Sequence, residues 1–298
     1  MIRFGLNGEI KAYIKRALLI FMFAAVGALV SGGAVFAYRY SIKNYEAPIT
    51  SFDTVSLFES QTKEKLKAVR LIADGGLASQ SPRDSSASFL AAAESGYDAV
   101  LIFVRETADG ELVVSKESRV DKMTDMKGEI KKLRYDNLLK AKIDNGANAE
   151  QFEGLGLLTF EEAMKICKKY RISPIIEAET LSEKALENLL NRVKENGLNE
   201  RAVLSLHDGA LLKKLAQKKN MPELCYAVEE LSADFSFFLK DNSIKSVMFN
   251  ADNYNGELIK SYCKEGYKLY CRDVNDTELI KRLCQLGVTD FITQRIVY

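Results

Sequence analysis

The sequence predicts an α/β protein, a (β/α)₈ barrel preceded by one N-terminal transmembrane helix. Two observations lead to this prediction. From about residue 67 onward, apolar runs of strand length alternate with amphipathic helical segments. Nearer the N-terminus, residues 17–38 carry no charged side chain. The alternation is typical of a parallel sheet covered by helices, and the uncharged stretch is long enough to cross a bilayer as a helix.

Eight segments have the composition of buried strands, and each ends in a polar or charged residue. They end at Asp74, Arg105, Glu179, His207, Glu229, Asn250, Arg272 and Thr293. Helical segments lie between them, among them residues 86–96, 159–170, 182–197, 209–219, 255–266 and 276–287. Eight such units in about 230 residues favour a closed barrel over an open sheet. Catalytic and binding residues of such barrels lie at the carboxyl ends of the strands.

One irregularity follows the second predicted strand. Asp109 and Gly110 stand in turn position before "ELVV", which predicts a hairpin with a short extra strand. Residues 116–156 then form a long insertion before the third strand that we expect to be polar and helical.

Composition excludes some classes of function. The chain holds 42 basic and 41 acidic residues, so it lacks the charge excess of a nucleic-acid-binding protein. Its five cysteines lie far apart without a CxxC pair, which argues against a zinc site or a disulfide framework.

The segment before the barrel sets the predicted domain boundaries and the localisation. Residues 1–16 are expected to be cytoplasmic, 17–38 to span the membrane, 39–66 to form a juxtamembrane linker, and 67–298 to form the barrel. Basic residues are denser before the span than after it, which places the barrel outside the cell membrane. A cleaved signal peptide is the alternative, but the apolar stretch exceeds the usual signal core of about 7 to 15 residues. We therefore expect a single-pass anchor that contacts membrane lipid.

Several motifs follow one another in a characteristic order. They are "SPRDSSASFLAAAESGYDAV", "TADGELVVSKESRVDKMT", "LLTFEEAMKICKKY", "PIIEAE", "VLSLHDGALLKKL" and "YCRDVNDTELIKRLCQLGVTDFIT". Over about residues 69–294 this order resembles the glycerophosphodiester phosphodiesterase family. The resemblance implies a barrel that hydrolyses glycerophosphodiesters with two histidines and a divalent cation, Ca²⁺ or Mg²⁺.

The resemblance also shows which catalytic groups this chain lacks. The family's first strand ends in His-Arg-Gly, with an acid/base histidine and a phosphate-holding arginine, whereas this chain has Asp74, Gly75 and Gly76. The family's hairpin carries His-Asp, whereas Lys116 and Glu117 stand there. Losing each proton-transfer group typically lowers a rate by about 10² to 10⁴.

The metal ligands implied by the resemblance are also mostly replaced. Leu101 and Phe103 occupy the positions of a Glu and an Asp on the second strand, and they supply no oxygen for a hard cation. On the third strand Glu177 matches a family ligand, while Glu179 replaces a phosphate-binding lysine. One retained carboxylate makes a poor metal site.

The remaining candidates all lie near predicted strand ends. As catalytic groups we consider Asp74 and His207, and as metal ligands Glu177 and Glu179; the ligand-binding candidates are Arg83, Lys116 and Arg272. Further carboxylates at the rim, Glu229, Asp252 and Asp273, could hold a cation in a new arrangement. The alternative is that rim residues are solvated and paired with neighbouring arginines.

Three functions therefore stand side by side. The favoured one is a membrane-anchored, catalytically inactive glycerophosphodiester phosphodiesterase-like barrel that binds a glycerol-phosphate-type ligand or a protein partner at the cell surface. The second is an active phosphodiester hydrolase with a relocated metal site. The third is a scaffold of a membrane complex, in which the span and the linker are the functional parts.

Overall fold

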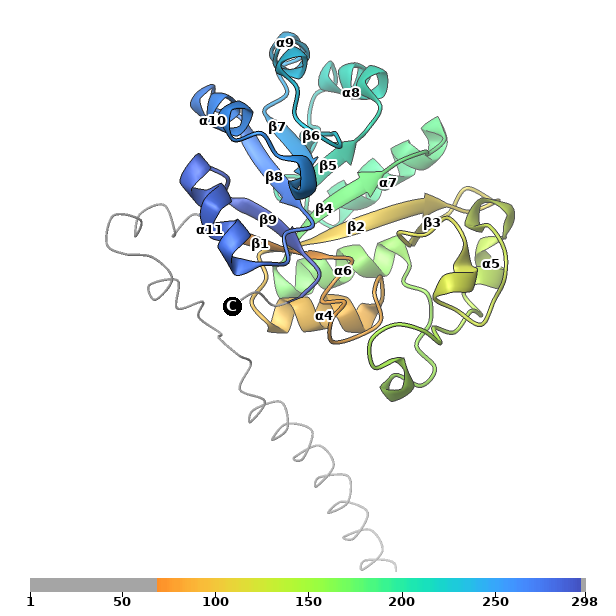
Figure 1. Cartoon of the computed structure of the whole chain (residues 1–298). Coiled ribbons are helices and arrows are strands. Elements are labelled where there is room, and N and C mark those ends of the chain that lie inside the picture. The colour runs from red at the N-terminus through yellow and green to blue at the C-terminus, as the bar shows by residue number, and fades with distance from the viewer. Residues whose placement is uncertain (1–68, 296–298) are drawn as a thin grey trace, which may run out of the picture. The chain divides into compact units, whose positions relative to one another are not determined.

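Eight parallel strands form one closed barrel in the computed structural model, which describes residues 69–295. Around the barrel the order is β1-β9-β8-β7-β6-β5-β4-β2, and β1 pairs with β2 to close it (Figure 1). The strands are β1 (Arg70–Asp74), β2 (Ala99–Glu106), β4 (Ser173–Ala178), β5 (Val203–Leu206), β6 (Glu223–Ala227), β7 (Ser246–Asn250), β8 (Lys268–Arg272) and β9 (Asp290–Thr293). They coincide with the eight apolar runs, so the predicted barrel is confirmed.

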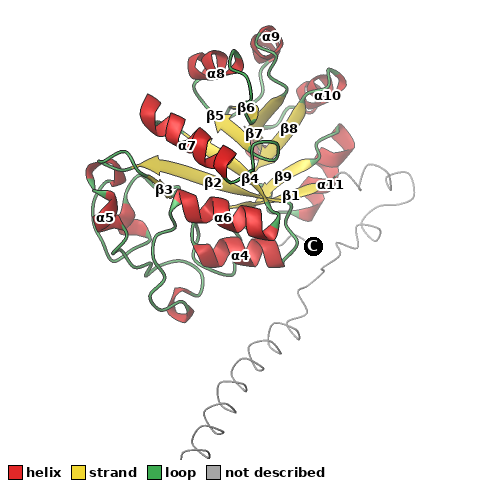
Figure 2. Ribbon diagram, turned by 180° about the vertical axis from the view of Figure 1, so that it is seen from behind, coloured by secondary structure: helices red, strands yellow, loops and turns green. Residues whose placement is uncertain are grey.

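Helices surround this barrel, as Figure 2 shows from the opposite side. They are α4 (Ser86–Glu94), α6 (Phe160–Tyr170), α7 (Glu183–Glu195), α8 (Gly209–Ala216), α9 (Ala233–Asp241), α10 (Gly256–Lys264) and α11 (Thr277–Leu286). Local signals begin and end them: Thr159 and Glu162 form a capping box before α6, and Gly287 closes α11 with φ 109°. The sequence pattern does not single out α9. Its exposed face carries Phe237, whose side chain is 72% exposed, so apolar residues occur on more than one face of this helix.

The side chains of the strands alternate between two apolar layers. On β2, Leu101 and Phe103 belong to the cluster inside the barrel, while Ile102 and Val104 pack in the layer beneath the helices. This alternation points every second strand residue toward the barrel axis. At the carboxyl ends, the same inward positions therefore line the mouth of the barrel.

The predicted hairpin is present, since β3 (Leu112–Val114) pairs antiparallel with β2. The insertion that follows is less helical than expected. It holds short 3₁₀ helices at Val120–Lys122, Ile130–Lys132 and Ala149–Gln151, and the four-residue α5 (Tyr135–Leu138), seen beyond β3 in Figure 2. Within the described residues 116–156, the insertion packs around a small apolar cluster of its own and contains no long helix. The cluster consists of Val113, Val120, Ile130, Leu138 and Leu157.

The predicted membrane segment, residues 17–38, lies outside the described residues, as do the predicted linker and the cytoplasmic N-terminus. Within residues 69–295, every helix is too short or too polar to span a bilayer.

Candidate functional site

A cavity of about 260 Å³ opens at the carboxyl ends of the strands, and below we call it the mouth. Its floor is apolar, formed by Leu101, Phe103 and Ile292. Charged residues make up most of its wall: Asp74, Lys116, Glu117, Glu177, Glu179, His207, Glu229, Arg272 and Asp273. Five of the eight predicted strand ends, Asp74, Glu179, His207, Glu229 and Arg272, thus line the place where a barrel of this type binds its ligand.

The turn after β1 depends on two glycines. Gly75 and Gly76 have φ of 68° and 85°, a region that side chains disfavour. A Cβ on Gly76 would lie 2.4 Å from the Ser88 hydroxyl oxygen, and a Cβ on Gly75 would lie 2.8 Å from Cγ of Arg83. The glycines therefore allow the following loop to fold back against the end of β1.

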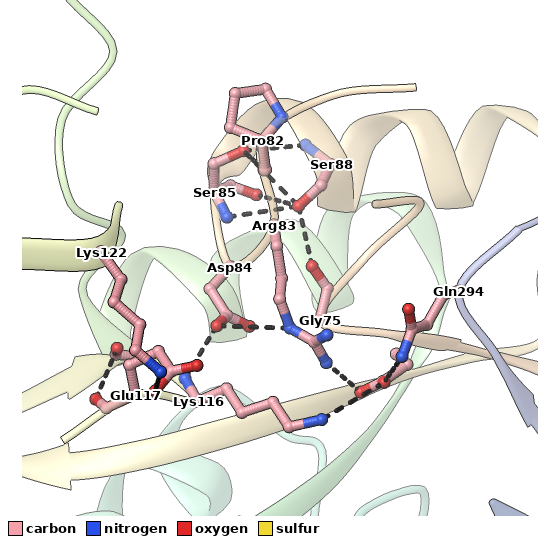
Figure 3. Close-up of polar contacts among 12 residues, drawn as sticks. Gly75, Pro82, Arg83, Asp84, Ser85, Ser88, Lys116, Glu117, Lys122 and Gln294 are labelled. Carbon is pink, nitrogen blue, oxygen red and sulfur yellow. Dashed lines mark hydrogen bonds and ion pairs between the residues drawn. The ribbon is translucent and has the colours of Figure 1, made fainter. Parts of the chain in front are cut away.

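This folded loop brings Arg83 to the buried carboxylate of Asp74. Arg83 Nη2 donates to Asp74 Oδ1, while Gln294 Nε2 donates to Oδ2 at 3.2 Å and Lys116 Nζ lies 3.9 Å from it (Figure 3). Although burial lowers it, the pKa of Arg83 is raised overall by the carboxylates of Asp74 and Asp84. In the family's motif an arginine follows the first-strand histidine, and Gly75 stands at that position here. Arg83 instead places a guanidinium in the same turn.

Phe103 lies beneath both cations. Its ring centroid is 5.4 Å from the Arg83 guanidinium carbon and 5.3 Å from Lys116 Nζ, distances at which a ring face attracts a cation. On β2, Phe103 is also the neighbour of Glu177 in the sheet register. An aromatic ring thus stands beside the carboxylate where a second oxygen ligand would be needed.

Glu177 is the second buried carboxylate of the mouth, with 3% of its side chain exposed. Arg272 Nη2 donates to its Oε2, and His207 Nε2 lies 3.3 Å from its Oε1. Burial lowers the pKa of Arg272 from its ordinary value, but a guanidinium stays charged in proteins. Both oxygens of the carboxylate are therefore occupied by side chains of this chain.

Glu179 lies apart from Glu177. Its carboxylate accepts from Arg105 Nη1 at 2.8 Å, and half of its side chain is exposed. Arg105 Nη2 also donates to the Lys116 carbonyl at 2.6 Å, which joins β2 to the hairpin. Glu179 thus helps to hold the wall of the mouth.

A divalent cation does not fit these residues. Within residues 69–295, no three side chains of His, Cys, Asp or Glu come together in an arrangement that could hold a metal ion. Glu177 is engaged by Arg272 and His207, and Leu101 and Phe103 offer no oxygen beside it. The carboxylates Glu229 and Asp273 also line the mouth, whereas Asp252 does not.

The structure groups the candidates into two ion-paired clusters. Asp74, Arg83 and Lys116 form one, and Glu177, His207 and Arg272 form the other. Sequence reasoning missed three further residues, Asp84, Phe103 as a ring beneath the cations, and Gln294. The sequence could not reveal the roles of these residues, because each role depends on contacts between segments that are distant along the chain.

Comparison with known proteins agrees with the geometry. Residues 76–297 match the family model described as the glycerophosphoryl diester phosphodiesterase family. A glycerophosphodiester phosphodiesterase of Caldanaerobacter subterraneus is 27% identical over 234 residues, covering 75% of this chain and 93% of that protein. The uncharacterized protein YqiK of Bacillus subtilis is 26% identical over 241 residues, covering 75% and 94%.

Solved structures share the fold. An Oleispira antarctica phosphodiesterase, determined in complex with the product sn-glycerol-3-phosphate, superposes with a TM-score of 0.69 at 18% identity, covering 77% of this chain and 95% of that one. The resemblance inferred from the sequence motifs is confirmed by the family match over most of the barrel. The chain belongs to the glycerophosphoryl diester phosphodiesterase family.

Proposed function

We propose that the barrel binds a phosphate-bearing ligand of the glycerol-phosphate type without hydrolysing it. One observation supports this most directly: each buried carboxylate of the mouth already has an arginine of the same chain as its counter-ion, Asp74 with Arg83 and Glu177 with Arg272. A divalent cation would have to displace a guanidinium from either one.

In the ion pairs of the two clusters the cation is more exposed than the carboxylate, which supports an anionic ligand. The side chains of Asp74 and Glu177 are 5% and 3% exposed, whereas those of Arg83, Lys116 and Arg272 are 18%, 42% and 17% exposed. An entering ligand therefore reaches the cation of each pair before its buried carboxylate, and Glu117, Glu179, Glu229 and Asp273 supply the other charges along the mouth. Guanidinium and ammonium groups are the usual protein partners of phosphate.

Hydrolysis would need groups that this mouth does not supply. Cleavage of a phosphodiester requires an acid/base pair and stabilisation of the developing charge, and the bound cation alone contributes several kcal/mol in metal-dependent enzymes. His207, the chain's one histidine, is bound to Glu177. The residues that remain can hold a phosphate but include no second histidine to complete such a pair.

Calorimetry on the full chain in detergent tests the proposal. We expect sn-glycerol 3-phosphate to bind in the presence of EDTA, and Lys116→Gln to weaken binding by about threefold to tenfold, as expected for a partly exposed charge-assisted contact. Lys184→Gln, which removes an exposed lysine of α7, is the matched control and leaves binding unchanged. Release of glycerol phosphate from glycerophosphoglycerol that requires Ca²⁺ or Mg²⁺ and is abolished by Glu177→Gln would refute the proposal and favour an active hydrolase.

We also propose that residues 17–38 hold the barrel at the outer face of the cell membrane. The uncharged segment and the basic residues before it support this. The full chain should stay with membranes after alkaline washing, and a chain lacking residues 1–38 should be released. Retention of the shortened chain would instead point to a protein partner that holds it there.

A further inference from the structure

Asp84 is a buried carboxylate beside the first cluster, next to the Arg83 guanidinium and the Lys116 backbone. It lies in the turn before α4 with φ 56°, and its Oδ2 accepts from the Lys116 backbone N–H at 2.8 Å and lies 3.7 Å from Arg83 Nε. Its Oδ1 has no hydrogen-bond partner among residues 69–295. Figure 3 shows the side chains of Arg83 and Asp84 leaving the same turn, with the Asp84 carboxylate next to Arg83 Nε and the Lys116 backbone.

The space around Oδ1 is closed by the glycine turn. A Cβ on Gly75 would lie 2.5 Å from this oxygen, so only glycine leaves room for it. The charged groups that face Asp84 are Arg83 from its own turn, Asp74 from the end of β1 and Lys116 from the hairpin. Two carboxylates therefore balance two cations, and an added anion would leave the cluster with excess negative charge.

Asp84 is the group best suited to remove that excess. Burial raises the pKa of Asp84 to about 6, with Arg83 and the Lys116 N–H bond acting in the opposite direction. When Oδ1 takes the proton, Oδ2 can still accept from the Lys116 N–H, so the turn and the hairpin stay joined. Asp74, in contrast, accepts from both Arg83 and Gln294, one on each oxygen.

We propose that Asp84 couples anion binding to proton uptake: an anion that binds to Arg83 and Lys116 draws one proton from solvent onto Asp84, and the mouth binds anions more tightly below neutral pH. Asp84 acts as a positioning residue, since its contacts are the Arg83 guanidinium and the Lys116 backbone N–H and not the ligand. The inference rests on the proposed anion-binding function. Coupling between two sites is reciprocal, so a proton on Asp84 strengthens anion binding by the same factor as the anion strengthens protonation.

Sulfate is the suitable probe, because its charge stays constant from about pH 5 to about pH 8 and cannot itself supply the pH dependence. Titration calorimetry of the full chain in buffers of different ionisation enthalpy measures the protons taken up per sulfate bound. Near pH 7 we expect uptake of a substantial fraction of one proton, and an affinity that increases several-fold, up to about tenfold, per unit fall in pH.

Asp84→Asn should bind sulfate without proton uptake and with an affinity independent of pH. Because imidazoles titrate in the same range, His207→Gln is the discriminating variant, and it should keep the proton uptake of the unmodified chain. Circular dichroism of each variant checks its fold, and the uptake by the unmodified chain tests the proposal even if Asp84→Asn does not fold.

Sulfate binding without proton uptake in the unmodified chain would overturn the coupling and leave the anion-binding function standing. Uptake that persists in Asp84→Asn, or that is lost in His207→Gln, would assign the proton to another residue. If neither sulfate nor sn-glycerol 3-phosphate binds at any pH, the proposed function and this inference both fail.

Discussion

Replacing Arg272 by methionine would leave the Glu177 carboxylate without its guanidinium partner. Glu177 is 3% exposed, and the Arg272 side chain that covers it is 17% exposed. A methionine in its place supplies no hydrogen-bond donor to the carboxylate. Within residues 69–295, His207 Nε2, 3.3 Å from the other carboxylate oxygen, is the only other charged or titratable side chain in contact with this carboxylate.

The expected loss in the free energy of unfolding is about 3 kcal/mol. Breaking a buried ion pair from one side usually costs about 3 to 5 kcal/mol, and the low end applies because His207 stays in place. For a folded part of this size, such a loss lowers the melting temperature by roughly 6 to 12 °C. Adding Glu177→Gln to Arg272→Met should restore most of the loss, because the uncompensated charge is gone.

Urea denaturation and thermal melts followed by circular dichroism measure these changes. Lys214→Met is the matched control, since it also removes a cation from a glutamate, but Glu183 is 88% exposed and the expected loss is below about 1 kcal/mol. The reasoning is wrong if Arg272→Met costs no more than Lys214→Met, or if the double variant is as unstable as the single one.

Three further substitutions test the framework of the site. Asp84→Asn should raise the free energy of unfolding at about pH 7.5 by up to about 3 kcal/mol, because burial raises this pKa from 3.8 to about 6. Urea titrations should show the gain shrinking as pH falls from about 6 to about 4, where the native aspartate also becomes neutral; a gain independent of pH would contradict this. Gly76→Ala should cost about 2 kcal/mol or more in thermal melts, since its Cβ would meet Ser88. Gly197→Ala, with a similar φ but open space, should cost less. Thr159→Ala should cost about 1 kcal/mol through the lost capping box, and equal stability of the two proteins would contradict the cap.

Most of the fold could be predicted because its signals are local. Each barrel strand is a short apolar run, and helices such as α6 and α11 carry their own cap residues. The insertion after β3 was predicted less well. Its short helices are held by a small cluster that joins Val113 to Leu157, and such contacts leave no periodic pattern in the sequence.

The sequence by itself determined which side-chain types are present at the family's catalytic positions. Leu101 and Phe103 cannot ligate a hard cation in any conformation, and the chain has one histidine in total. The position of Asp74, Glu177, Glu179, His207 and Arg272 at the mouth also followed from the sequence, because parallel strands in a closed barrel end on the same face.

Only the tertiary structure decided how the remaining charges are paired. Glu177 and Arg272 are 95 residues apart, and Asp74 and Gln294 are 220 apart, so no local pattern could join them. The burial of Asp84 likewise requires the glycine turn to fold against the hairpin that carries Lys116. Residue types set which groups can carry charge, but the free energy of each charge depends on its depth and its partners, and barrel closure sets both.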